Sequence, residues 1–252
     1  MNLTGKTALV TGGASGLGRS VVDAMLDAGA NVVVCDLPHR ADEVGDLGKS
    51  VLFAPTDVSS ADDVAEAVRS GVEQFGAIHV AVNCAGIAWA QRTVDKNGPH
   101  PLEVFQKVVE VNLVGTFNVI RLAAAQMATQ APDGEERGVI VNTASIAAYD
   151  GQIGQVAYAA SKGGVVAMTL PIARDLARMQ IRVCTVAPGT MNTPMLALLS
   201  DEQRAALAAG IPHPARLGEP SDFAALVRHV CENPYLNGET IRLDGALRMP
   251  PK

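Results

Sequence analysis

The chain has 252 residues, of which 48% are hydrophobic, and its formal net charge at pH 7 is −6. This length and apolar content suit one large α/β domain with a single core. The chain is acidic and has no basic block, so it is a poor partner for nucleic acid. It also has no uninterrupted apolar run of about 18 residues, so we expect no contact with a membrane.

Short apolar runs alternate with longer amphipathic segments along the chain. We predict strands over Lys6–Thr11, Asn31–Asp36, Val51–Ala54, Ile78–Asn83, Gly138–Thr143, Ile181–Val186 and Thr240–Leu243. We predict helices over Leu17–Ala28, Ala61–Phe75, Pro101–Thr129, Val156–Met179 and Ser221–Glu232. Nearly continuous apolar strands are typical of a parallel sheet that helices cover on both faces. The pattern predicts an α/β fold with a doubly wound parallel sheet, formed by a single domain over residues 1–252.

A glycine-rich turn joins the first predicted strand to the first predicted helix. The sequence TGGASGLG at residues 11–18 has the spacing Gly-x-x-x-Gly-x-Gly. Glycine lets a ligand approach the backbone closely, and the N–H groups at the start of a helix attract an anion. Taken alone, the spacing also fits a tight turn with no ligand. Before a helix, it predicts a phosphate-binding turn for a cofactor, with contacts from Gly12, Ser15, Gly16, Leu17 and Gly18.

Residues at the ends of the next strands extend this predicted site. Asp36 ends the second strand, where a carboxylate accepts hydrogen bonds from the adenosine ribose and repels a 2′-phosphate. Because Ser15, and not Lys or Arg, stands directly before Gly16, NAD is favoured over NADP. Ligands of such sheets bind beyond the carboxyl ends of the strands. We therefore predict further cofactor contacts after the third and fourth strands, from Asp57, Val58, Asn83, Cys84, Ala85 and Gly86.

Ser145, Tyr158 and Lys162 form a second constellation. Ser145 follows the fifth strand, and Tyr158 and Lys162 lie one helical turn apart on one face of a predicted helix. Interconversion of an alcohol and a carbonyl needs proton transfer at oxygen, which a phenol with a pKa of about 10 performs poorly near neutrality. We expect Lys162 to lower the pKa of Tyr158, and Ser145 to hold the substrate oxygen. Alone, the Tyr-x-x-x-Lys spacing would equally describe a surface pair.

Together these motifs resemble the short-chain dehydrogenase/reductase family. The matching pieces run in the family's order and comprise TGGASGLG, Asp36, Asp57, NCAG, Asn112 in VEVNLVGTFN, Ser145, YAASK and Ala187-Pro188-Gly189. The resemblance implies a Rossmann-type fold and an NAD cofactor that Tyr158 and Lys162 also contact. It implies that Asn112 bends its helix and holds a water linking Lys162 to solvent, which completes the catalytic set. It also places residues 188–193 over the nicotinamide, with contacts from Pro188, Gly189, Met191 and Thr193.

Longer stretches are similar to a narrower group, the type-2 3-hydroxyacyl-CoA dehydrogenases, also known as hydroxysteroid dehydrogenase type 10. They include NTASIAAYDGQIGQVAYAASKGG, MTLPIARDLA and ENPYLNGETIRLDGALRMPPK. This resemblance implies NAD-linked oxidation of 3-hydroxyacyl-CoA, activity on steroid alcohols, and a homotetramer packed through its long helices. The chain departs from the group where bulkier apolar residues are typical, at Thr190, Met191 and Asn192. Three cations either form a rim for CoA or are ordinary solvated charges: Arg92, Lys96 and Lys107.

Two other functions stay open at this point. An NADPH-linked 3-oxoacyl-carrier-protein reductase would share the fold and the catalytic residues, and a non-catalytic dinucleotide-binding subunit would share the fold alone. The five histidines lack metal-ligand spacing, so we predict no metal. The four cysteines form no C-x-x-C pair and the first residues resemble no targeting signal, so we expect reduced thiols and a cytoplasmic location. The sequence places Trp89 in either a pocket or the core.

Overall fold

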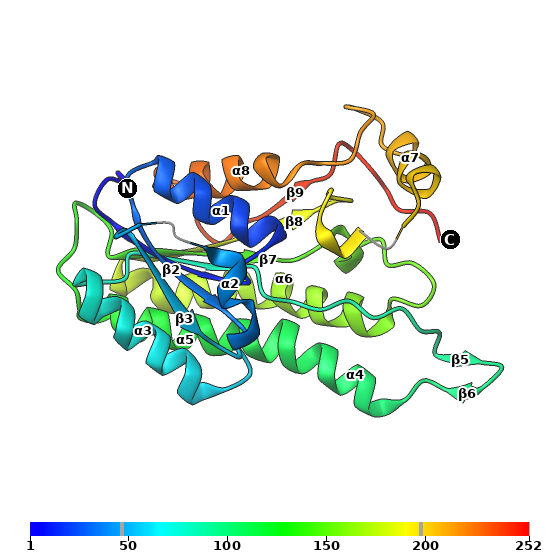
Figure 1. Cartoon of the computed structure of the whole chain (residues 1–252), viewed down its shortest axis with the longest axis horizontal. Helices are drawn as coiled ribbons and strands as arrows, with labels where there is room; N and C mark the ends of the chain where they lie inside the picture. Colours follow the sequence, from blue (N-terminus) through cyan, green and yellow to red (C-terminus); the bar gives the residue numbers. More distant parts are fainter. Residues whose placement is uncertain (46–47, 197–198, 252) are drawn as a thin grey trace.

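Seven parallel strands form the central sheet of the computed structural model, which describes residues 1–45, 48–196 and 199–251 (Figure 1). The strand order is β3-β2-β1-β4-β7-β8-β9, so it reverses between β1 and β4. The strands are β1 (Thr7–Thr11), β2 (Asn31–Asp36), β3 (Val51–Pro55), β4 (Val80–Asn83), β7 (Gly138–Thr143), β8 (Ile181–Pro188) and β9 (Thr240–Leu243). The predicted parallel α/β sheet is confirmed, with differences only at strand ends.

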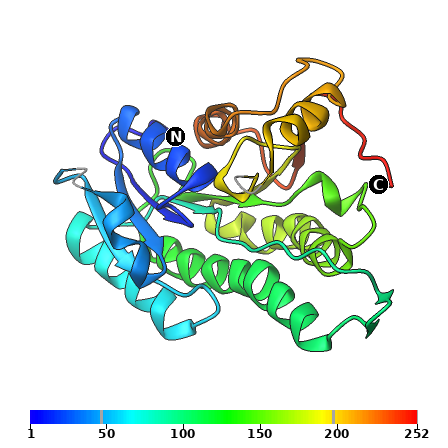
Figure 2. The ribbon, with the colours of Figure 1, turned by 45° about the vertical axis from the view of Figure 1, so that its right-hand side comes forward.

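Helices cover both faces of the sheet (Figures 1 and 2). On one face lie α1 (Gly16–Asp27) and α8 (Pro220–Glu232), and on the other lie α3 (Ala61–Phe75), α4 (Leu102–Val109), α5 (Gly115–Thr129) and α6 (Val156–Leu176). Successive residues of a strand point to opposite faces, so Val10 packs into the core beside α1 and α8 while Leu9 packs into the other core. Burial on both faces is why the strands are apolar almost throughout.

The predicted helix Pro101–Thr129 is interrupted at its centre. It begins at Leu102, and a π-helical turn at Glu110–Val114 separates α4 from α5. The turn places Asn112 inside the molecule, where the residue is fully buried. Such turns shift the helical register locally and often occur at functional sites.

Two helical regions are long and apolar enough, by length and composition, to cross a membrane: Leu102–Thr129 and Val156–Met179. Neither region is an uninterrupted apolar run, since charged residues such as Lys107 and Lys162 lie within them, and the expectation of no membrane contact stays a prediction. In the most apolar 18 residues of each region, half of the first stretch and a third of the second are buried. Both regions pack on the sheet and contribute Val119, Ile120 and Ala173 to its core, which accounts for part of their apolar composition.

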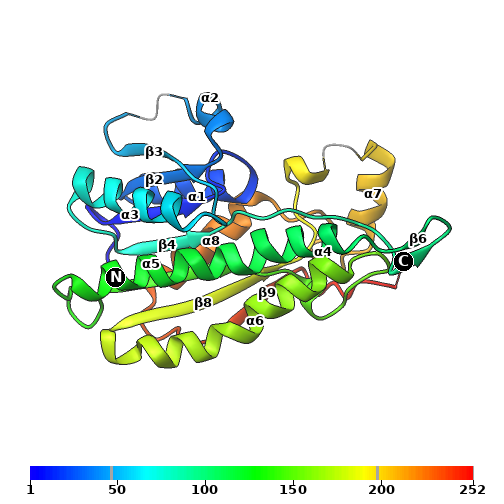
Figure 3. The ribbon, with the colours of Figure 1, turned by 90° about the horizontal axis from the view of Figure 1, so that it is seen from below.

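Several short elements were not predicted. They are a 3-10 turn at Pro38–Arg40, α2 (Ala41–Val44), the hairpin strands β5 (Val94–Asp95) and β6 (Gly98–Pro99), and α7 (Asp201–Ala209). None of the residues of α7 is buried, so it carries no clear amphipathic signal. A capping box formed by Ser200 and Gln203 begins this helix. Figure 3 shows α7 and the hairpin at the carboxyl end of the sheet, where the candidate site lies.

Candidate active site

A cleft of about 850 Å³ lies at the carboxyl ends of the strands, around the point where the strand order reverses. Of the residues predicted to bind cofactor or act in catalysis, all but Asn83 and Asn112 line it. They are Gly12, Ser15, Gly16, Leu17, Gly18, Asp36, Asp57, Val58, Cys84, Ala85, Gly86, Ser145, Tyr158, Lys162, Pro188, Gly189, Met191 and Thr193. The topology thus brings residues from distant parts of the chain into one cavity.

The glycine turn fits closely between its neighbours. Gly12 has a φ of +64°, and a Cβ there would lie 2.9 Å from the backbone nitrogen of Ala85. A Cβ on Gly18 would lie 2.1 Å from the carbonyl oxygen of Gly12. Thr11 accepts hydrogen bonds on Oγ1 from the backbone N–H groups of Cys84 and Ala85, at 3.1 and 3.2 Å. Only glycine permits this packing, which holds the start of α1 open toward the cleft as a cradle for an anion.

Two carboxylates face the cleft beyond the glycine turn. Asp36 accepts hydrogen bonds from the backbone N–H groups of Ala14, at 3.0 Å, and Leu37, at 2.9 Å. These bonds fix its carboxylate beside the turn. Asp57 accepts from the hydroxyl of Ser59 at 2.6 Å, and this hydrogen bond holds the pKa of Asp57 below its usual range. The cradle and the two acids fit the diphosphate and the adenosine of a dinucleotide.

Asn83 departs from its predicted place. It is buried and does not line the cleft, because its side chain donates to Oδ1 of Asn142 on β7 at 2.9 Å. Asn142 in turn donates to Oγ1 of Thr185 on β8 at 3.4 Å. This row of polar side chains crosses three strands, so the Asn83 side chain links strands, and its predicted cofactor contact stays a prediction.

Ser145, Tyr158 and Lys162 meet at the centre of the cleft. The Ser145 hydroxyl faces the Tyr158 phenol closely enough to lower its pKa, and Ser145 Oγ accepts a hydrogen bond from the backbone N–H of Ala147 at 3.1 Å. Lys162 donates from Nζ to the carbonyl of Thr143 at 2.7 Å, and its Nζ lies 5.8 Å from the centre of the Tyr158 ring. The three side chains therefore have the mutual placement that the sequence predicted.

The pKa values of this group differ from expectation. Burial raises the pKa of Tyr158 above its ordinary value, and the hydrogen bond with Ser145 offsets part of that rise. Burial also lowers the pKa of Lys162 to about 8. The prediction that Lys162 lowers the pKa of Tyr158 is therefore not met by the protein alone, because burial is the largest cause of the shift and Lys162 is not among its causes.

Asn112 holds the loop after β4 against α6. Its Oδ1 accepts from the N–H of Ile87 at 2.8 Å, and its Nδ2 donates to the Ile87 carbonyl at 2.9 Å and to Ser161 Oγ at 3.1 Å. Ser161 donates to the carbonyl of Tyr158 at 2.8 Å. Asn112 thus acts on the helix that carries Tyr158 and Lys162 from outside the cleft, and its water-holding role stays a prediction.

Several residues at the substrate end were not predicted from the sequence. Trp89 is 53% exposed and faces the cleft, which decides between pocket and core. Of the three candidate rim cations, Lys107 lines the cleft and Arg92 and Lys96 do not. The remaining unpredicted wall residues include Gln152, Gln155, Leu196, Leu207 and Met249. The capping box before α7 could have indicated the helix that carries Leu207, whereas no sequence signal marks Met249.

Comparison with known proteins identifies the chain's family. A family model described as short chain dehydrogenase matches residues 6–204. The chain belongs to this family. It is 55% identical over 255 residues to 3-hydroxyacyl-CoA dehydrogenase type-2 of Bos taurus, which covers 99% of this chain and 98% of the relative. It is 56% identical over 248 residues to the protein of that name from Drosophila melanogaster, with 96% and 97% covered.

A solved structure gives the same result. The crystal structure of 3-hydroxyacyl-CoA dehydrogenase type-2 from Mycobacterium avium matches with a TM-score of 0.92 and 44% identity, and 98% of each chain is covered. The resemblance seen in the sequence and the Rossmann-like fold are confirmed. The protein is an oxidoreductase of the type that acts on CH–OH groups, and its family uses a nicotinamide dinucleotide.

Proposed function

We propose that this protein catalyses the reversible NAD-dependent oxidation of 3-hydroxyacyl-CoA thioesters to 3-oxoacyl-CoA. The observation that carries the proposal is the meeting of Ser145, Tyr158 and Lys162 in a cleft that also holds the glycine turn and Asp36. Relatives that cover almost the whole chain bear the name of that activity. Oxidation of a steroid alcohol is a further proposed activity of the same site, since its walls include large apolar side chains.

Each of the three residues has a separate task in the proposed reaction. A nicotinamide bound in the cleft would accept the hydride from the carbinol carbon. The Ser145 hydroxyl donates to the substrate oxygen and holds it beside Tyr158. Tyr158 accepts the proton of the substrate hydroxyl as the carbonyl forms, and Lys162 stabilises the phenolate that this requires. In the reverse direction Tyr158 returns the proton.

The preference for NAD over NADP rests on Asp36. Its carboxylate is fixed by two backbone N–H groups at the edge of the cleft, where a ribose 2′-phosphate would meet a negative charge. Arg40 also lines this part of the cleft, but its guanidinium pairs with Glu43 at 2.7 Å. Titration of the protein with NADH and NADPH tests the preference, and tighter binding of NADPH would favour the 3-oxoacyl-carrier-protein reductase function instead.

We propose a homotetramer in the cytoplasm as the working form. Support for self-association comes from large apolar side chains on α4, the π-helical turn, α5 and α6 that are exposed in the single chain. They include Leu102, Val114, Phe117 and Leu170. Light scattering coupled to size-exclusion chromatography measures the number of subunits. The proposed location rests on the four thiols, which are all unpaired.

The central experiment follows NADH formation from 3-hydroxybutyryl-CoA in the wild type, Tyr158→Phe and Tyr235→Phe. Tyr235 is 98% exposed on a distant loop, so its variant removes the same hydroxyl without touching the cleft. We expect Tyr158→Phe to lose roughly 10²- to 10⁴-fold in kcat, the usual contribution of general acid–base catalysis, and Tyr235→Phe to keep wild-type turnover. Equal turnover in the three proteins would refute the role of Tyr158. Inactivity of the wild type on 3-hydroxyacyl-CoA, with NADH formed from other alcohols, would refute the substrate alone.

A further inference from the structure

The segment after β9 lies against the loop after Ser145. The backbone N–H of Ile153 donates to the carbonyl of Pro251 at 3.0 Å, and the side-chain amide of Gln152 donates to the carbonyl of Pro250 at 3.1 Å. We call these two parts the 146–155 loop and the 244–251 segment. Both border the cleft, since Gln152 comes from the loop and Met249 from the segment.

Arg242, on β9, joins the two parts directly. Its Nη2 donates to Asp150 Oδ2 at 2.7 Å, and its Nε donates to Asp244 Oδ2 at 2.7 Å. The same Nη2 donates to the carbonyl of Leu247 at 3.0 Å, and the guanidinium lies 5.2 Å from the centre of the Tyr149 ring. The Arg242 and Asp150 side chains are each 22% exposed, so the pair is largely shielded from solvent. A planar fork of donors makes this set of contacts, and a lysine ammonium cannot reproduce it.

Apolar packing couples the segment to the neighbourhood of Ser145. Ile146, which directly follows Ser145, forms a buried cluster with Ile211 and Leu247, and Met249 packs against this cluster. The segment begins with a tight turn in which Ala246 has a φ of +67°, a conformation uncommon for a residue with a side chain. Its N–H donates to Asp244 Oδ1 at 3.0 Å, so the carboxylate that pairs with Arg242 also holds this turn.

We propose that the 244–251 segment is a wall of the substrate end of the cleft. In this proposal Met249 is a specificity-determining residue that limits the length of the substrate chain. Arg242 is the positioning residue that sets the distance between that wall and Ser145. The assignment of the chain-length limit rests on the function proposed above, whereas the coupling of the segment to the loop by Arg242 does not.

The first experiment compares kcat/KM for 3-hydroxydecanoyl-CoA and 3-hydroxybutyryl-CoA in Met249→Ala, Arg242→Met and the double variant. Removal of the Met249 side chain opens the wall, and loss of Arg242 loosens it, so both changes raise the long-to-short ratio of kcat/KM. A displacement of Ser145 would lower kcat/KM for the long and the short substrate by the same factor, so it would not change their ratio. We expect a change of roughly tenfold, the size that a methylene or two in an apolar pocket can produce.

The double variant and a matched control separate positioning from a general loss of stability. If Arg242 acts through Met249, the two changes share one wall and the double variant will not exceed the larger single effect. Arg69→Met is the control, since Arg69 also pairs with two carboxylates, Glu66 and Glu73, but on the exposed face of α3. We expect the long-to-short ratio of kcat/KM in Arg69→Met to equal that of the wild type. A uniform loss of rate on both substrates in Arg242→Met, or additive effects in the double variant, would overturn the proposal.

A second experiment needs no turnover. Hydrogen exchange in Arg242→Met should be faster in the 146–155 loop and the 244–251 segment, and unchanged in the strands β1 and β2. Unchanged exchange in the loop would overturn the coupling. If the wild type oxidises simple secondary alcohols but no 3-hydroxyacyl-CoA, the proposed substrate fails, and the same ratio measured with a long and a short alcohol still tests the wall.

Discussion

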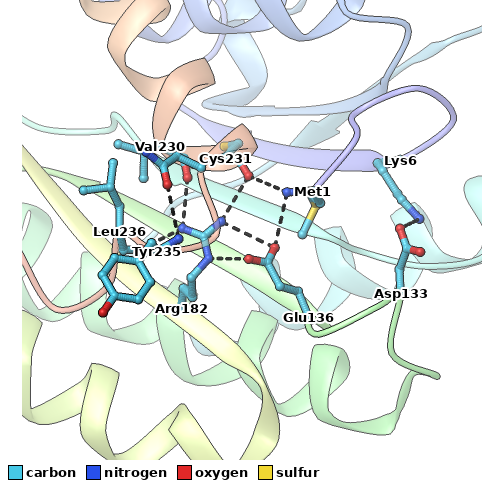
Figure 4. A network of polar contacts seen from close by, with 10 residues as sticks. Met1, Lys6, Asp133, Glu136, Arg182, Val230, Cys231, Tyr235 and Leu236 are labelled. Atoms are coloured by element: carbon cyan, nitrogen blue, oxygen red, sulfur yellow. Dashed lines mark hydrogen bonds and ion pairs between the residues drawn. The ribbon is translucent and has the colours of Figure 1, made fainter.

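Two buried cations lie at opposite ends of the sheet, and their surroundings differ. Arg182, at the amino end of β8, is 5% exposed, and Lys162, beside the carboxyl end of β7, is 4% exposed. Arg182 donates to both carboxylate oxygens of Glu136, at 2.6 and 3.4 Å. Its other hydrogen bonds go to three backbone carbonyls around the end of α8 (Figure 4), those of Val230, Cys231 and Leu236.

Lys162 has no such compensation. Its one hydrogen bond goes to the carbonyl of Thr143, and within the described residues no carboxylate lies at ion-pair distance from it. Its pKa falls to about 8 as a result of burial. A buried charge without a partner lowers stability and is typical of functional sites, whereas a fully paired one is typical of a structural role. The contrast supports a structural role for Arg182 and the catalytic role proposed above for Lys162.

The largest expected effect is on stability in Arg182→Met. The variant leaves the buried Glu136 with only the Met1 ammonium, at 3.5 Å, as a cation partner. It also removes the donor from the carbonyls of Val230 and Leu236, whereas the Cys231 carbonyl still accepts from Met1. We expect the free energy of unfolding to fall by about 3–5 kcal/mol. Urea denaturation at fixed protein concentration measures it, since any subunit assembly makes stability depend on concentration. Adding Glu136→Leu should recover part of the loss, and a single variant within 1 kcal/mol of the wild type, on the order of an exposed pair, would contradict the structural role.

Lys162→Met should give the opposite pattern. We expect turnover to fall by roughly a thousandfold, because the phenolate of Tyr158 loses its stabilising cation. The free energy of unfolding should stay level or rise, because the variant removes an unpaired buried charge and keeps the apolar stem. Steady-state kinetics and urea denaturation on the same preparations make the comparison. A variant that is both inactive and strongly destabilised would place Lys162 with Arg182 as a structural residue.

The pH dependence of stability sharpens the contrast. The pKa of Lys162 is about 8 in the folded chain against 10.5 for a free lysine, so between these values the unfolded chain binds more protons. Stability therefore rises with pH across this window, and the cost of Lys162, about 3 kcal/mol, is fully present below pH 8. The advantage of Lys162→Met over the wild type should shrink as pH rises from 8 to about 10. An advantage that stays constant over that range would show that Lys162 is not desolvated.

The sheet and most of the site could be predicted from the sequence for one physical reason. Parallel strands buried on both faces must be apolar throughout, so their ends are marked by the first polar or glycine residues. The carboxyl ends of such strands meet at one edge, and Asp36, Asp57 and Ala85 consequently line the same cleft. The sequence did not indicate that the Asn83 side chain joins Asn142, and the predicted contact of this stretch with the cofactor stays a prediction.

Contacts between distant, charged segments could not be predicted. Glu136 belongs to a polar stretch, QAPDGEERG, that reads as a surface loop, yet it is 6% exposed because Arg182 reaches it from β8. The pKa of Tyr158 depends on burial, which the Tyr-x-x-x-Lys spacing does not report. Met249 likewise lines the cleft in a segment held by Arg242 and by a turn at Ala246, and no sequence pattern marks these contacts.

The smallest expected effect belongs to an exposed pair on α8. Arg228 donates from Nε to Glu232 at 2.9 Å, and the two side chains are 44% and 41% exposed. Arg228→Met should cost about 0.5 kcal/mol or less, and the cost should vanish at about 1 M salt, where exposed charges are screened. The pair has the same ion types as Arg182 and Glu136, whose shortest contact is 2.6 Å, and its helix supplies two of the carbonyls that Arg182 binds. The two pairs differ mainly in burial and in those carbonyl bonds. If Arg228→Met and Arg182→Met lowered the free energy of unfolding by similar amounts in urea denaturation, burial would not explain the stabilising role of Arg182.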